Sequence, residues 1–97
     1  MGLLRQHELA AWMTFFSAEV VNGRVPDESR FFAALVLVSE AAAARDRATL
    51  ALAHEACRSL RENLPEHPSR ALWEGRLWAV ETLAWLGGEG RVAPGDQ

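Results

Sequence analysis

The 97-residue sequence has no lysine, isoleucine or tyrosine, and its single cysteine is Cys57. One cysteine excludes an internal disulfide and a four-cysteine zinc site. The codons of the three absent residues are AT-rich, so their absence is associated with a GC-rich genome, and we expect a bacterial or phage origin. All ten basic residues are arginine, and thirteen acidic residues bring the net charge to −3. Because binding to a phosphate backbone needs clustered cations, we expect no direct contact with nucleic acid.

Long apolar runs and targeting signals are also missing. The longest apolar run covers residues 31–38, far short of the roughly 20 residues that span a bilayer. Arg5, His7 and Glu8 interrupt the segment where a signal peptide would have its apolar core. We therefore expect a soluble, cytoplasmic protein that does not contact a membrane.

What the sequence does contain is typical of helices. Alanine and leucine dominate, and β-branched residues never alternate with polar ones as a strand requires. We predict an all-α fold, a compact four-helix bundle, with one helical domain over residues 1–88 and a flexible C-terminal tail over 89–97. The expected helices run from about 3 to 20 or 21, from 26 or 27 to 44, from 47 to 64, and from 68 or 69 to 86.

Glycine and proline mark most of the predicted helix ends. Asn22-Gly23 ends the first helix, Pro65 ends the third, and Gly87-Gly88 ends the fourth. The segment Arg45-Asp46-Arg47 has neither residue, so a single helix of nearly forty residues is the alternative there. We favour a tight turn, with Asp46 as the cap of a new helix.

The fourth predicted helix holds three of the four tryptophans. At 100° per residue, Trp73 shares one face with Leu77, while Trp78 and Trp85 share a second face because they are seven residues apart. Either both faces are core, or the second face is exposed and binds a partner. Tryptophan is enriched at binding hot spots, which favours the second interpretation.

These patterns predict a non-catalytic protein–protein interaction module, such as an adaptor, small chaperone or regulator. The predicted partner-binding residues are Trp78 and Trp85, with Glu74, Glu81 and Phe15 as a rim or second patch. Apolar surplus on the first and fourth helices makes a homodimer a further expectation. We expect no catalytic residue, metal or cofactor. The alternative is a phage- or plasmid-encoded acidic inhibitor that covers the basic groove of a nucleic-acid-processing enzyme.

Two pairs of residues have spacings that occur in metal sites or in catalytic motifs. His54 and Cys57 are three residues apart on a helix, but no third ligand lies nearby, and Cys57 falls on an apolar stripe. Arg61 and His67, with five residues between them, are similar to the Arg-x(4–6)-His motif of HEPN ribonucleases. That resemblance implies RNA cleavage across a dimer and is the second alternative, although Pro65 interrupts the motif.

The stretch from about 31 to 86 resembles part of a tetratricopeptide-repeat array, whose units are helical hairpins of 34 residues. With Pro65 as the closing proline, Ala41, Ala53 and Gly75 fall where small residues are expected, and Trp78 falls where an aromatic is usual. Glu40, Glu74 and Ala44 depart from the pattern. The resemblance implies helical hairpins that bind a protein or peptide.

Overall fold

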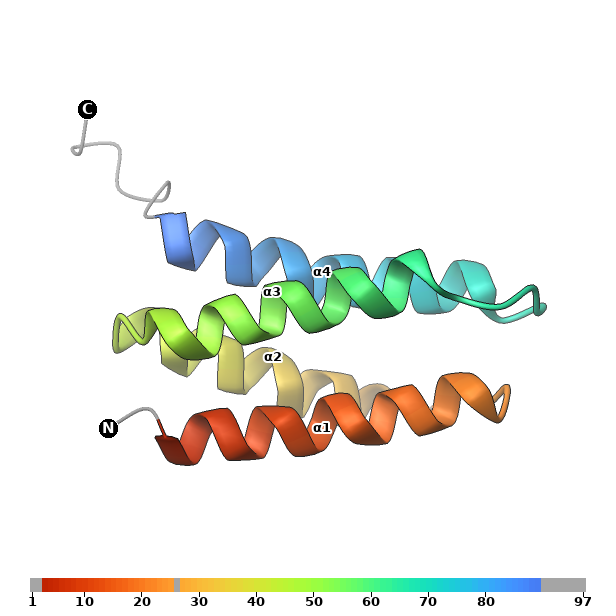
Figure 1. Cartoon of the computed structure of the whole chain (residues 1–97), viewed down its shortest axis with the longest axis horizontal. Coiled ribbons are helices and arrows are strands. Elements are labelled where there is room, and N and C mark those ends of the chain that lie inside the picture. Colours follow the sequence, from red (N-terminus) through yellow and green to blue (C-terminus); the bar gives the residue numbers. More distant parts are fainter. Residues whose placement is uncertain (1–2, 26, 90–97) are drawn as a thin grey trace.

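The computed structural model describes residues 3–25 and 27–89. Within these ranges the chain forms four α-helices and no strand, which confirms the predicted all-α fold. The helices are α1 (Leu3–Val21), α2 (Glu28–Ala43), α3 (Arg47–Glu62) and α4 (Arg70–Glu89). Successive helices run in opposite directions, so the first turn of α1 and the last turn of α4 lie at the same end of the bundle (Figure 1).

The four helices form two layers around one core. In Figure 1, α1 and α3 lie in front of α2 and α4, and α3 packs most extensively against α4. All four helices contribute buried side chains to this core. The largest fully buried side chains are Trp73, Phe16, Leu9, Leu50, Leu77, Val38 and Val80, with Thr49 and Cys57. Four helices in two layers are compatible with a bundle and with paired hairpins, so the tetratricopeptide resemblance stays a prediction.

Both chain reversals at the ends of α1 and α2 use a residue with left-handed backbone. After α1, Gly23 has φ +69°, and the Arg24 N–H donates to the carbonyl of Glu19 at 2.9 Å. After α2, Arg45 has φ 57°, and the Asp46 N–H donates to the carbonyl of Ala41 at 2.8 Å. These six-to-one bonds satisfy helix carbonyls and stop each helix within one turn.

The predicted break between the second and third helices is therefore confirmed. Asp46 caps α3: its carboxylate accepts from the Thr49 N–H at 3.2 Å and from the Thr49 hydroxyl at 2.6 Å. Arg5 of α1 pairs with the same carboxylate at 3.1 Å. This cap thus also ties the start of α1 to the start of α3.

The predicted end of the fourth helix is wrong. The helix α4 continues through Gly87 and Gly88 to Glu89. A Cβ on Gly87 would lie 2.8 Å from the Cβ of Ala42, so glycine here permits close approach of α4 to α2 rather than a helix stop. Residues 90–97 of the predicted tail, and Pro26 of the first connector, lie outside the described residues.

An aromatic cluster fixes the orientation of α4. Its ring pairs are Phe16–Phe31, stacked with centroids 4.5 Å apart, and Phe31–Trp73, edge to face at 5.3 Å. The Trp73 indole N–H donates to the carbonyl of Arg24 at 3.0 Å. Because Trp73 is locked between α1, α2 and their connector, the opposite flank of α4 must turn outward. Across the described ranges, no helix is sufficiently long and apolar to cross a membrane.

Candidate functional site

The three tryptophans of α4 lie in different surroundings. Trp73 is 2% exposed, whereas Trp78 is 58% and Trp85 is 42% exposed. The difference follows from helix geometry, since Trp78 and Trp85 lie more than a quarter turn from the buried stripe that Trp73 begins. We call the surface formed by Trp78 and Trp85 the tryptophan face.

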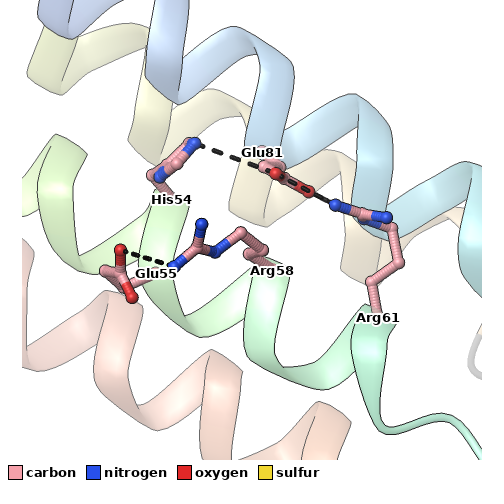
Figure 2. Close-up of polar contacts among 5 residues, drawn as sticks. All are labelled: His54, Glu55, Arg58, Arg61 and Glu81. Carbon is pink, nitrogen blue, oxygen red and sulfur yellow. Dashed lines mark hydrogen bonds and ion pairs between the residues drawn. The ribbon is translucent and has the colours of Figure 1, made fainter.

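Glu81 lies on the inner border of the tryptophan face and is only 9% exposed. Its carboxylate accepts two hydrogen bonds from the Arg61 guanidinium, at 2.8 and 3.2 Å, and lies 3.8 Å from His54 Nε2. Figure 2 shows Glu81 reaching from α4 between these two α3 side chains. The bond to Glu81 raises the pKa of Arg61. Glu81 therefore joins the two helices and does not form the exposed rim that the sequence predicted.

The other two predicted rim residues have different positions. Glu74 lies on α4, is partly exposed and sits 3.7 Å from the Arg70 guanidinium. Phe15 packs edge to face on Trp12 at 5.9 Å, and the Arg30 guanidinium lies 5.7 Å from its ring centroid. Phe15 thus lies where α1 meets α2, so it belongs to a surface separate from the tryptophan face.

A hollow of about 400 Å³ adjoins the tryptophan face between α3 and α4. Its lining residues are Arg47, Leu50, Ala51, His54, Ala84, Trp85 and Gly88, and we call it the α3–α4 hollow. Small side chains at Ala51, Ala84 and Gly88 leave the space open beside the Trp85 indole. Arg47 could not be predicted as a site residue from the sequence, because its place beside Trp85 depends on the register between α3 and α4.

Phe32 is a third exposed aromatic among the described residues, and the sequence patterns did not predict its exposure. Phe31 and Phe32 are adjacent, and adjacent residues on a helix point about 100° apart. Phe31 is buried, while Phe32 is 65% exposed. Phe32 lines a separate hollow of about 270 Å³ between α2 and α4, together with Leu35 and Arg76.

The residues considered for metal binding point to different places. Cys57 is buried, its thiol lies 3.7 Å from the Met13 sulfur, and burial raises its pKa to about 12. His54 instead faces Glu81. Over residues 3–25 and 27–89, no three His, Cys, Asp or Glu side chains gather as metal ligands would.

Arg61 and His67 also contact different groups. Arg61 is engaged by Glu81, and His67 lies in the connector before α4, where its Nδ1 is 2.8 Å from the Ser69 hydroxyl. The His67 ring packs against the Gly23 turn. In the part of the chain that the structure describes, Arg61 and His67 thus have separate contacts.

Arginine–carboxylate pairs break up the acidic surface on all four helices. They include Glu19–Arg24, Asp27–Arg30, Glu55–Arg58 and Glu66–Arg70. A continuous carboxylate patch, which the acidic-inhibitor alternative needs, receives no support from this pattern. Comparison of the chain with protein-family models, with curated proteins and with solved structures finds no match.

Proposed function

We propose that this chain is a non-catalytic protein–protein interaction module that binds a partner polypeptide through the tryptophan face. One observation carries the proposal: α4 buries Trp73 almost completely while it leaves Trp78 and Trp85 58% and 42% exposed. Two exposed indoles seven residues apart are an apolar surface that a partner can desolvate. The proposal includes the cytoplasmic location expected from the sequence.

The surroundings of the indoles support a binding role. Glu81, Arg61 and His54 form a part-buried ion-pair network that holds α3 against α4. The helix α4, which carries the tryptophan face, is therefore tied to α3. A rigid platform loses little conformational entropy on binding, which favours affinity.

The experiment compares alanine variants of exposed aromatics by quantitative affinity capture from the native host. In Trp78→Ala/Trp85→Ala we expect loss of at least one specifically captured protein, because hot-spot truncation costs about 2 kcal/mol or more, roughly 30-fold in affinity. The matched control is Phe32→Ala, which removes an exposed ring from α2 and is expected to leave that capture unchanged. Circular dichroism checks that both variants stay helical.

Three outcomes would contradict the proposal. The double tryptophan variant would keep the captured partner, Phe32→Ala would lose it equally, or the double variant would unfold because the indoles are structural. Light scattering on the wild type and the double variant tests the other occupant that the sequence predicts, a second copy of this chain. A wild-type dimer that becomes a monomer in the double variant would assign the tryptophan face to self-association.

A further inference from the structure

The α3–α4 hollow combines cationic and apolar groups in one place. Arg47 and His54 lie seven residues apart on α3, and among the described residues that line the hollow they are the two with basic side chains. The Trp85 indole and the small residues of α4 provide the apolar wall. Arg47 thus gives the hollow one positive charge in a chain whose net charge is −3.

Within the described ranges, neither Arg47 nor His54 has a close carboxylate partner of its own. Across residues 3–25 and 27–89, Arg47 forms no ion pair with a carboxylate. The carboxylate nearest His54 is Glu81, at 3.8 Å, and Glu81 already accepts two shorter bonds from Arg61. An incoming anion would thus meet one unpaired guanidinium and one weakly engaged imidazole.

We propose that the α3–α4 hollow receives an acidic segment of the partner polypeptide, with a carboxylate between Arg47 and His54 and an adjacent apolar side chain on Trp85. Charge complementarity selects the carboxylate, and the indole selects the apolar neighbour. Guanidinium–carboxylate hydrogen bonds are among the stronger ones in proteins. This inference rests on the proposed function and names the chemistry that the partner presents beside the tryptophan face.

A polypeptide fits this site better than a nucleic acid does. Strands of nucleic acid need a track of cations along successive phosphates. Among the described lining residues, Arg47 carries a permanent charge and His54 is charged only when protonated. A single carboxylate with an apolar neighbour matches the one guanidinium and the one indole of the described lining.

The test is an NMR titration of the full chain with a defined probe, the amidated dipeptide N-acetyl-leucyl-glutamate. We expect shifts of the Trp85 indole N–H and of Arg47 at millimolar dipeptide. Affinity is expected to fall about tenfold in Arg47→Gln, which removes a charge-assisted hydrogen bond. It is also expected to fall in Ala51→Leu, which fills the hollow from an exposed α3 position. The matched control is Arg58→Gln, since Arg58 pairs with Glu55 at 3.5 Å and does not line the hollow.

Several results would overturn the inference: no shifts with the dipeptide, equal binding of the glutamine analogue, equal binding of inorganic phosphate or of a dinucleotide, or equal losses in Arg47→Gln and Arg58→Gln. Affinity capture separates this inference from the proposed function. If Trp78→Ala/Trp85→Ala loses the partner while Arg47→Gln keeps it at wild-type affinity, the tryptophan face stands and the acidic-segment inference fails. If both variants keep the partner, the proposed function itself fails.

Discussion

A Cβ on Gly87 would lie 2.8 Å from the Cβ of Ala42, closer than two such atoms can approach. The helices α4 and α2 are therefore in backbone-level contact at this point. Gly75, earlier in the same helix, has open space where a Cβ would stand. The two glycines share a helix and differ in what surrounds them, so they form a matched pair.

Alanine substitution should separate these two glycines. Gly75→Ala is expected to raise the free energy of unfolding by about 0.5–1 kcal/mol, because alanine favours helix. Gly87→Ala gains the same amount but forces α2 and α4 apart, and overpacking costs about 1–3 kcal/mol, so the net change should be destabilising. Urea denaturation followed by circular dichroism measures both changes. Equal stabilisation by the two substitutions would contradict the close approach at Gly87.

The same glycine shows where prediction from sequence fails. Gly87-Gly88 is a helix-ending pair by local preference, yet α4 continues because packing on α2 stabilises the helical form. Local preference did succeed at Gly23, whose φ of 69° is the left-handed backbone that glycine adopts readily. The turn at Arg45 was also predicted, although no residue there favours left-handed backbone, because Asp46 provides a cap for the following helix.

For the candidate site too, spacing along one helix could be predicted, whereas contacts between helices could not. Helical spacing predicts that Trp73 and Trp78 lie on different faces, and the exposed fractions agree. Spacing says nothing of what faces Glu81 across the bundle, so its pairing with Arg61 and its burial could not be predicted. The place of Arg47 in the α3–α4 hollow has the same origin, since it depends on how α3 and α4 are aligned.

The Asp46 cap should make stability depend on pH. Hydrogen bonds from Thr49, with a further contribution from Arg5, lower the pKa of Asp46 below its ordinary value of 3.8. A lowered pKa in the folded state means that the carboxylate stabilises the fold above pH 3.8 and loses this contribution as the pH falls through the folded-state pKa. We expect the wild type to lose more stability between neutral pH and pH 3 than Asp46→Asn does, measured by thermal melting at each pH. An identical pH dependence in the two proteins would contradict this role.

The Arg61–Glu81 pair should couple α3 to α4. Removing either partner leaves a part-buried charge without its hydrogen bonds, so Arg61→Ala and Glu81→Ala should each lower the Tm by several degrees. Because they remove the same interaction, the double variant should lose less than the sum of the two. The control is Glu74→Ala, whose carboxylate is partly exposed and lies 3.7 Å from Arg70. Additive losses at Arg61 and Glu81 would show that the two side chains act independently.

The Cys57 thiol should be unreactive in the folded protein. Burial raises the pKa of its thiol to about 12, and the thiolate is the form that reacts with disulfide reagents. A raised pKa means that the thiol stays protonated at neutral and mildly alkaline pH while the protein is folded. We expect no reaction with Ellman's reagent at pH 8 under native conditions and full reaction in denaturant.

Substitution of Cys57 tests whether its surroundings in the folded protein are apolar. Serine places a hydroxyl among apolar groups beside Met13, and an uncompensated buried hydroxyl costs about 1–3 kcal/mol. Alanine leaves only a small void, so Cys57→Ser should be less stable than Cys57→Ala in urea denaturation. If the serine variant were the more stable one, or if native Cys57 reacted at the rate of the unfolded chain, the thiol would lie in a polar, accessible setting, and the core packing between α1 and α3 described above would be wrong.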